Sequence, residues 1–539
     1  MLVLAVFAYL YALGSLSIPN IGDEAPYFQI TRLTAESGEW LPLKAAEGLE
    51  NTKPPMLFWQ GIVSTDWGRE WSTWRLRVPI VFYTFLTALL VFALARHISG
   101  TTENGYIAAL LFLSFSSTFQ HGRPFLTNMP ETFFMFLVFY LLLRFRRTEL
   151  QWQFWIAAGL LMGAASLYRS FAVIAPMGLA LAWYCWWRRR WNLLDTVRKD
   201  WWKPTVAVII GLLCFGLWPL LDPRPELIFQ KFFLQENVGK FGGSDYFKNL
   251  FLGGYSGFRV WFGPVTNAGL LALPILYLAV VSFRQRKVLM LEEKALWIMV
   301  LSYLAIFTLP TQRQENYVLP VMPVLAVLLA MQWNRINKIW FVVFLLPAII
   351  AAVLFALLMY ALVANDAYDI HYALWHPVAL LLALAAIGAS LFWLDLSRYL
   401  LPAVVLLLYL SFGVLLSPFD GSIGRYTENT LRQLKNRTVY IPSNFRSSYE
   451  RHRFLLPGAD IRGYPGKDIG KRKTLIDHGE IVAIRLPVSA VLPENFAIYG
   501  QRLVVRSRLT GGELFKILFQ HQIDVMLRRE ILVQLKAVS

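Results

Sequence analysis

The chain has 539 residues, of which 57% are hydrophobic and 16% are charged, and its formal net charge is +17. A mean hydropathy of +0.48 excludes an ordinary soluble globular protein. Apolar runs near or above the roughly 18–20 residues that a helix needs to cross a bilayer recur from residue 2 to residue 416. We therefore expect a polytopic α-helical membrane protein, because helices satisfy their backbone hydrogen bonds internally in lipid.

About thirteen spans are expected, and residues 1–17 are interpreted as a retained first span because they lack the basic start of a cleavable signal peptide. Basic clusters such as 144–147, 188–203 and 284–294 fill alternate loops, which the positive-inside rule places in the cytoplasm. The N-terminus is then cytoplasmic and the C-terminal part lies outside. The predicted spans are residues 2–19, 77–95, 105–119, 129–143, 154–167, 171–187, 205–221, 264–283, 295–310, 317–333, 338–364, 376–394 and 399–416.

The composition changes at the end of the last predicted span. The C-terminal residues are charged and contain strand-like alternations punctuated by Gly-Gly and Pro-Gly pairs, at 438–441, 480–484 and 503–506. Two domains are therefore expected. Residues 1–417 form a transmembrane domain with outer loops at 20–75 and 222–263, and residues 418–539 form a small soluble α/β domain on the outer side.

Two carboxylates stand next to each other directly after the first apolar segment. Asp23 and Glu24 are costly to desolvate at the mouth of a membrane helix, which favours a functional role. The alternative is that they cap a juxtamembrane helix. Glu131 enters another apolar run, where a buried carboxylate is presumed to be functional. Asn128 shares a helix face with Glu131 and is equally suited to be an N-cap.

Several expected outer loops carry a cation at a point where the backbone is restricted. Lys53 precedes two prolines, Arg169 interrupts an apolar stretch, and Arg313 and Arg123 lie in short loops between spans. Pinned cations on one side of a membrane suit a phosphate group. The alternative is that these side chains snorkel to the interface. His121 is a lone histidine and is expected to be structural.

Three motifs together resemble the lipid-dependent glycosyltransferases of the GT-C type, and within it the bacterial aminoarabinose transferase and protein O-mannosyltransferase-like group. They are Asp23-Glu24, Lys53-Pro54-Pro55 about thirty residues later, and Tyr-Val-Leu-Pro-x-x-Pro from Tyr317. The resemblance covers residues 1–335 by motif. It implies an enzyme that moves a sugar from a polyprenyl-phosphate donor to a lipid, glycan or protein acceptor, usually with inversion, at the outer face of the bacterial inner membrane.

The resemblance also suggests roles for single residues. Asp23 is expected to act as general base or to orient the substrates, while Lys53, Arg169 and Arg313 bind the donor phosphate. Arg123 completes the expected phosphate-binding set, and Glu24, Glu131 and Asn128 complete the expected catalytic set. The expected substrate contacts are Tyr27, Tyr317, Glu236 and Asn237, the last two in a stretch that resembles the lid segment of these enzymes.

The chain departs from this family pattern at three positions. Many relatives have Asp where Asn128 stands, and Asn cannot act as a base, so either Glu131 takes that role or no second acid is needed. Thr52 and Asn316 stand where aminoarabinose-type relatives often have an acid and a His. These two differences argue against metal binding and against aminoarabinose as the sugar. No cofactor is expected, and the residues present do not support a divalent metal.

Two other classes fit a polytopic chain. A lipid or sugar transporter typically shows internal repeats and helices broken at mid-membrane, whereas this chain shows no repeat and places its polar clusters at span ends. A non-catalytic assembly partner with a degenerate site is the second alternative, suggested by Asn128. Membrane lipids and a lipid-linked sugar are the expected partners. Nucleic acid is not, because basic loops are ordinary in a membrane protein.

Overall fold

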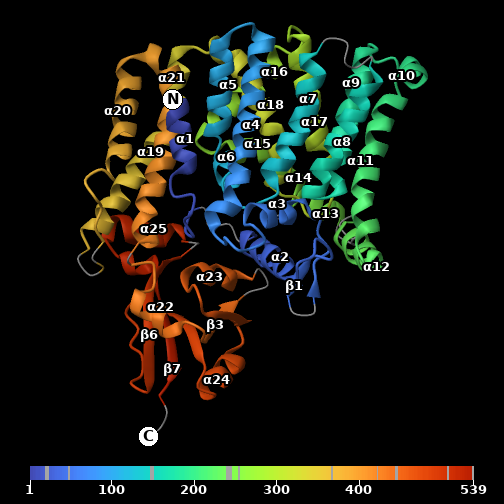
Figure 1. Cartoon of the computed structure of the whole chain (residues 1–539). Helices are drawn as coiled ribbons and strands as arrows, with labels where there is room; N and C mark the ends of the chain where they lie inside the picture. The colour runs from blue at the N-terminus through green and yellow to red at the C-terminus, as the bar shows by residue number, and fades with distance from the viewer. Residues whose placement is uncertain are drawn as a thin grey trace.

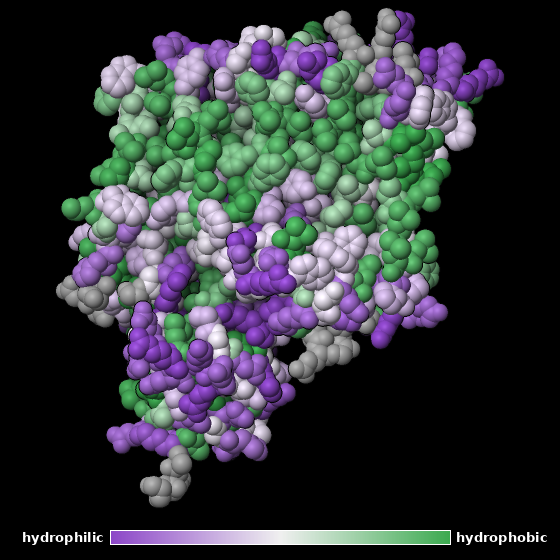
Figure 2. All heavy atoms as spheres, in the orientation of Figure 1, coloured by the Kyte–Doolittle hydropathy of each residue, from purple (hydrophilic) through white to green (hydrophobic). Residues whose placement is uncertain are grey.

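The computed structural model describes residues 1–18, 23–46, 49–145, 151–237, 246–252, 255–365, 368, 370–421, 423–443, 447–506 and 509–536. Most of the chain forms a bundle of helices, and a smaller sheet-containing region lies at one end of it (Figure 1). A broad hydrophobic band runs across the bundle and is bordered by polar side chains at both ends (Figure 2). The band is what a bundle embedded in lipid requires.

Among the described residues, six helical stretches are long and apolar enough to cross a membrane, and α20 (Val378–Phe392) is a shorter apolar helix. The six are Thr73–Ser99 (α4), Trp202–Leu221 (α11), Gly263–Arg284 (α15 and α16), Glu315–Trp333 (η6 and α18), Lys338–Val363 (α19) and Leu394–Asp420 (α21 and η8). The other long bundle helices are α5 (Thr102–Ser114), α7 (Asn128–Arg144), α8 (Trp152–Tyr168), α9 (Ile174–Arg188) and α17 (Leu291–Thr308). The chain is thus a multi-pass membrane protein with a mostly helical fold.

Helix α18 (Met322–Trp333) is the centre of the bundle, because every one of its residues is buried. A helix that is apolar all round needs such a position. Helices α8 and α11 approach each other closely at small residues. A Cβ added at Gly163 would lie 2.5 Å from the Cβ of Cys214, so only glycine fits there. This contact fixes α8, at whose end Arg169 stands.

The predicted first span differs from the structure. Helix α1 (Leu2–Leu10) ends well before residue 19, and the following residues are turns. Carbonyl groups at the end of α1 and in this turn segment accept hydrogen bonds from the buried side chains of Arg77 and Arg123. Side-chain donors therefore replace the intrahelical partners that these carbonyls would otherwise need.

Short elements form a layer between the bundle and the sheet region (Figure 1). The layer contains α2 (Glu24–Ser37), α3 (Met56–Ser64) and a small hairpin of β1 (Lys44–Ala46) and β2 (Leu49–Glu50). Other short helices of the chain are α6 (Ser116–His121), α10 (Leu193–Lys199), α12 (Pro225–Ile228), α13 (Tyr246–Phe251) and α14 (Gly257–Trp261). They connect the bundle helices at its two ends.

The C-terminal region contains a five-stranded mixed sheet with the order β4-β3-β5-β7-β6. Its strands are β3 (Thr438–Ser443), β4 (Asp460–Pro465), β5 (Ile481–Leu486), β6 (Phe496–Val505) and β7 (Leu527–Leu535), with helices α22 (Glu428–Leu434), α23 (His452–Leu455), α24 (Ile469–Asp477) and α25 (Gly511–Gln520). The parallel pairs are β3 with β4 and β5, and the antiparallel pairs join β7 to β5 and β6. The strand-like runs predicted from the sequence overlap β3, β5 and β6.

The sheet region holds α2 through a compact set of contacts. Arg32 of α2 forms an ion pair with the buried Glu450, in which its Nη2 donates to Oε1 at 2.9 Å and its Nε donates to Oε2 at 3.2 Å. Tyr449 hydrogen-bonds Gln29, and the ring of Phe454 packs edge-on against Phe28. Because α2 begins next to Asp23, the sheet region contributes to the position of that carboxylate.

Candidate functional site

A cavity of about 320 Å³ lies at the end of the bundle, next to the layer that contains α2 and α3. Its lining comes from segments that are far apart in the sequence: the start of α2, the turn before α3, the start of α7, the end of α8 and the turn before η6. The predicted site residues that line it are Asp23, Tyr27, Lys53, Asn128, Arg169 and Tyr317.

The first wall of the cavity combines an acid, an aromatic ring and a cation. Asp23 directly precedes α2, and Tyr27 lies one helical turn further on. The Lys53 ammonium lies 5.4 Å from the centre of the Tyr27 ring, a cation–π distance. Pro54 and Pro55 follow Lys53 and lead into α3, so the backbone that carries the ammonium is stiff.

A second part of the lining is built around an ion pair. Arg169 ends α8, and its Nη1 donates to Oε2 of the fully buried Glu131 at 2.6 Å. The guanidinium also lies 5.0 Å from the centre of the Tyr317 ring. Oε1 of Glu131 has no hydrogen-bond partner among the described residues. Glu131 thus fixes the Arg169 guanidinium with one carboxylate oxygen, and its other oxygen can still accept a hydrogen bond.

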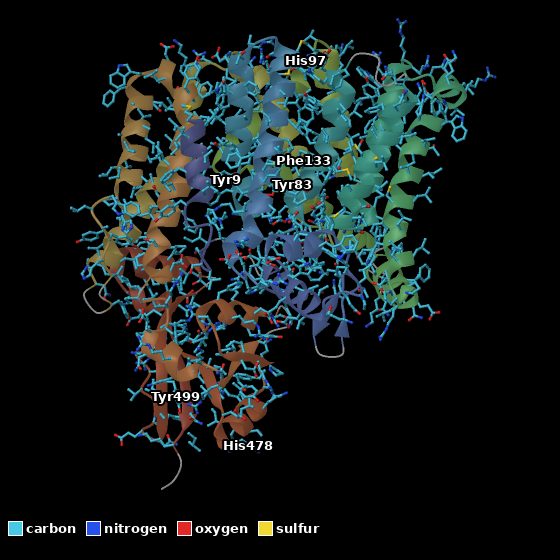
Figure 3. All side chains as sticks on the ribbon, viewed as in Figure 1. Tyr9, Tyr83, His97, Phe133, His478 and Tyr499 are labelled. Atoms are coloured by element: carbon cyan, nitrogen blue, oxygen red, sulfur yellow. The ribbon has the colours of Figure 1, made fainter. Side chains whose placement is uncertain are left out.

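Aromatic residues form the side of the cavity that faces the bundle. Tyr168 lines the cavity, and its hydroxyl donates to Gln60 at 2.8 Å and lies 3.2 Å from the hydroxyl of Tyr83. Tyr83 of α4 and Phe133 of α7 lie together in the lower half of the bundle (Figure 3), with ring centres 5.4 Å apart. Tyr168 thus links the cavity to aromatic residues inside the bundle.

Glu24 lies outside the lining, although the sequence predicted it as catalytic. Its two oxygens accept from Nε and Nη2 of Arg77, each at 2.7 Å, and Oε1 also accepts from the backbone N–H of Phe125 at 2.8 Å. Burial by itself raises the pKa of the Glu24 carboxyl, but Arg77 and these hydrogen bonds bring that pKa below its usual value. These contacts favour a structural role for Glu24.

Two predicted phosphate-binding cations also lie outside the lining. Arg123 donates to the carbonyls of Tyr9 at 3.1 Å and Tyr11 at 2.5 Å; the Tyr9 ring is labelled beside α1 in Figure 3. Arg313 is fully buried and donates to the carbonyls of Thr308 at 2.6 Å and Tyr255 at 3.0 Å. Both guanidinium groups hold irregular backbone in place, which requires donors where helical bonds are missing.

The predicted lid segment is described only in part. The backbone of Glu236 and Asn237 belongs to a π-helix, η3 (Phe229–Asn237), but their side chains lie outside the described part of the chain. Residues 238–245, which complete the segment, lie outside it as well. Phe232 of the same helix lines the cavity.

Sequence reasoning missed several lining residues, among them His121, Gln312, Gln314 and Asn316. His121 was expected to be structural, yet it faces the cavity, and burial together with the nearby Arg169 lowers its pKa to about 4. The polar turn before Tyr317 was a usable signal, because the six consecutive polar residues 311–316 between two spans rarely serve packing alone. Within the described residues, no three His, Cys, Asp or Glu side chains gather closely enough to hold a metal ion.

Known proteins share both sequence and fold with this chain. A family model for dolichyl-phosphate-mannose-protein mannosyltransferase matches residues 22–225. The undecaprenyl phosphate-alpha-4-amino-4-deoxy-L-arabinose arabinosyl transferase 2 of Pseudomonas fluorescens (strain Pf0-1) is 26% identical over 342 residues, which cover 61% of this chain and 58% of that protein. The chain therefore aligns with less than two thirds of that relative's length.

The structural match covers more of the chain than the sequence match does. The crystal structure of ArnT from Cupriavidus metallidurans bound to undecaprenyl phosphate superposes with a TM-score of 0.65, covering 99% of this chain and 97% of that one at 16% identity. The chain thus shares the fold of that ArnT structure, and residues 22–225 resemble the mannosyltransferase family in sequence. The resemblance predicted from its motifs is thereby confirmed. At this identity the superposition establishes a shared fold, and the site has to be argued from the residues of this chain.

Breaking the buried pair at Glu24 should destabilise the protein. Arg77→Met leaves the buried Glu24 carboxylate with only the more distant Arg451, 3.7 Å away, and breaking a buried pair typically costs about 3–5 kcal/mol. We expect a clear fall in the thermal unfolding temperature of the purified protein. The double variant Glu24→Leu, Arg77→Met should recover part of the loss because it removes the buried carboxylate, although Arg451 then loses its contact with Glu24. Equal loss in both variants would contradict this explanation.

The contact between Arg32 and Glu450 should fix the sheet region on α2. Arg32→Glu places a third acid beside Glu36 and Glu450, so we expect a loss of about 2–4 kcal/mol and faster protease cleavage in the C-terminal region. The swap Arg32→Glu, Glu450→Arg should restore part of the protection. Arg432→Glu, in an ion pair that is 80% and 87% exposed, is the matched control and should change little.

Proposed function

We propose that this chain is an integral-membrane glycosyltransferase that moves a sugar from a polyprenyl-phosphate donor to an acceptor at the outer face of the bacterial inner membrane. The observation that carries the proposal is the cavity in which Asp23, Lys53 and Arg169 meet, although they come from three separate segments. An acid and two cations at the end of a membrane bundle suit a substrate with a phosphate, a sugar and a lipid tail.

The orientation of the bundle supports an outer location for the cavity. Helix α10 belongs to the basic loop 188–203 and lies at the end of the bundle opposite to α2 and the sheet region (Figure 1). Basic loops mark the cytoplasmic side. The cavity and the C-terminal region then face the periplasm, and the N-terminus is cytoplasmic. Each of the thirteen predicted spans overlaps a bundle helix, although α1 is shorter than its predicted span.

Lys53 and Arg169 would bind the donor phosphate. Arg169 offers a planar fork of donors, while Lys53 is a compact point charge on a stiff backbone. Because Glu131 occupies one side of the Arg169 guanidinium, the remaining donors point to the cavity. When the bond between the anomeric carbon and the phosphate oxygen breaks, these cations stabilise the charge of the leaving polyprenyl phosphate.

Asp23 would act on the acceptor. An acceptor hydroxyl attacks the anomeric carbon on the face opposite to the phosphate, its oxygen forms the new glycosidic bond, and its proton passes to the Asp23 carboxylate. A phosphate acceptor needs no base, and Asp23 would then orient it. Lipid, glycan and protein acceptors all remain compatible with this arrangement. Undecaprenyl phosphate, present in the crystal structure of ArnT from Cupriavidus metallidurans, is the proposed lipid carrier.

Replacing the proposed base should abolish turnover but leave donor binding intact. For a hydroxyl acceptor, we expect Asp23→Asn to lower kcat about 10²–10⁴-fold, the usual contribution of a general base. Transfer from a radiolabelled undecaprenyl-phosphate sugar to membranes measures it. Asp66→Asn, an exposed acid in the same outer loop, is the matched control and should leave transfer unchanged. Full activity of Asp23→Asn would refute the base role.

Removing a phosphate-binding cation should weaken the affinity for the lipid carrier. We expect Lys53→Ala to raise the Kd for undecaprenyl phosphate about 10-fold or more, because a charge-assisted contact is lost. Lys53→Arg should bind with intermediate affinity, since it keeps the charge and changes the geometry. Lys467→Ala, on the exposed surface of the sheet region, serves as the control. Unchanged affinity in Lys53→Ala would place the phosphate elsewhere.

A further inference from the structure

A second polar chamber, of about 310 Å³, adjoins the proposed active-site cavity. His121, Gln314 and Asn316 line both spaces and so form the boundary between them. The other walls come from α6, α14, α15 and the start of η6. They carry hydroxyl and amide groups together with one guanidinium and one carboxylate, from Ser116, Gln120, Arg259, Thr266, Asn267 and Glu315.

The walls of this chamber are held in fixed positions. The amide Nδ2 of Asn267 donates to the carbonyl of Glu315 at 2.7 Å, and the hydroxyl of Ser116 donates to the carbonyl of Asn267 at 3.0 Å. The guanidinium of Arg259 forms an ion pair with the Glu315 carboxylate. The pair neutralises both charges of the lining, so the chamber is polar without being charged.

Two buried polar atoms at the boundary lack partners. Nδ1 of His121 and Oδ1 of Asn316 form no hydrogen bond to any described residue. Buried polar atoms are rarely left in this state, so each is expected to meet a ligand or a water molecule. Burial and the neighbouring Arg169 lower the pKa of His121 to about 4, so its ring is neutral near pH 7. The boundary therefore presents an uncharged imidazole and an amide.

We propose that this chamber binds the hydroxyl groups of an uncharged sugar ring, namely the glycosyl group of the polyprenyl-phosphate donor. This assignment rests on the proposed function. Amide and hydroxyl groups both donate and accept hydrogen bonds, which matches the alternating donors and acceptors of a sugar. An amino sugar would need a free carboxylate, but the carboxylate in this lining, Glu315, is already paired with Arg259. A uronic acid would meet the same neutralised pair.

The position of the boundary agrees with a donor that lies across both spaces. Asn316 directly precedes Tyr317, whose ring lies against the Arg169 guanidinium. Asp23 and Arg169 are both close enough to His121 to act on its pKa. A sugar that extends from a phosphate on Lys53 and Arg169 thus reaches His121 and Asn316 without leaving the neighbourhood of Asp23. Its anomeric carbon stays within the cavity while its ring hydroxyls enter the chamber.

Binding measurements on the purified full-length protein in lipid nanodiscs test this assignment. The probes are undecaprenyl phosphate, undecaprenyl phosphate bearing glucose or mannose, and undecaprenyl phosphate bearing 4-amino-4-deoxy-arabinose. We expect a hexose-bearing probe to bind at least about 10-fold more tightly than the amino-sugar probe, since unpaired polar groups penalise the wrong ligand. Asn316→Ala should weaken binding of that hexose-bearing probe about 10-fold and leave undecaprenyl phosphate unaffected.

His121→Gln is a second variant, and it should reduce the preference for the hexose-bearing probe over the amino-sugar probe. Asn334→Ala, at the opposite end of α18 on the exposed surface, is the matched control and should behave as the wild type. Unfolding temperatures of all variants show whether a loss of binding is a loss of folding. If one boundary variant does not fold, the preference measured in the other still decides the result.

The outcomes separate the two proposals. If the wild type does not bind undecaprenyl phosphate, or if Lys53→Ala binds it unchanged, the proposed function fails. If the wild type binds the bare lipid phosphate but the boundary variants weaken all probes equally or none, the sugar assignment is overturned. A tighter complex with the amino-sugar probe overturns it as well.

Discussion

The buried ion pair between Glu24 and Arg77 is the constraint on which the arrangement of the cavity depends. Arg77 of α4 reaches the start of α2 and also donates to the carbonyls of Leu13 and Ser15. Glu24 accepts in addition from the backbone of Phe125. The pair thereby joins four segments of the chain at one point. Since Asp23 is the neighbour of Glu24, this ion pair also positions the Asp23 carboxylate at the cavity. Glu24 itself does not line the cavity.

Two other buried arginines also stabilise backbone at this end of the bundle. Arg123 and Arg313 are buried, and each donates to a carbonyl near the end of a helix and to a carbonyl of a turn. A membrane protein tolerates irregular backbone only where other groups satisfy it, and a guanidinium carries five donors. The cations that line the cavity, among the described residues, are Lys53 and Arg169, one held by prolines and the other by Glu131. Arg123 and Arg313 therefore support the backbone, whereas Lys53 and Arg169 are available to the proposed phosphate.

The site is supported from two sides. The apolar bundle, centred on α18, fixes the ends of α7 and α8, and the C-terminal sheet region holds α2 through Arg32 and Glu450. The cavity lies where these two supports meet, next to the neutral chamber bounded by His121 and Asn316. This arrangement places the charges of the proposed phosphate site in the cavity and the hydrogen-bonding groups of the proposed sugar site in the chamber. It explains why the residues involved are spread over nearly three hundred positions of the sequence.

By itself, the sequence determined that the chain is a helical membrane protein, because span length and hydropathy are local properties. Its Asp-Glu, Lys-Pro-Pro and Tyr-Val-Leu-Pro motifs also determined the family resemblance. Only the tertiary structure decided which polar residues share a cavity. Asp23 and Glu24 are adjacent in the sequence, yet Glu24 turns to Arg77, and Arg123 and Arg313 turn to carbonyls that no motif reveals. The physical reason is that a buried charge is directed by its partner, and that partner comes from a distant segment.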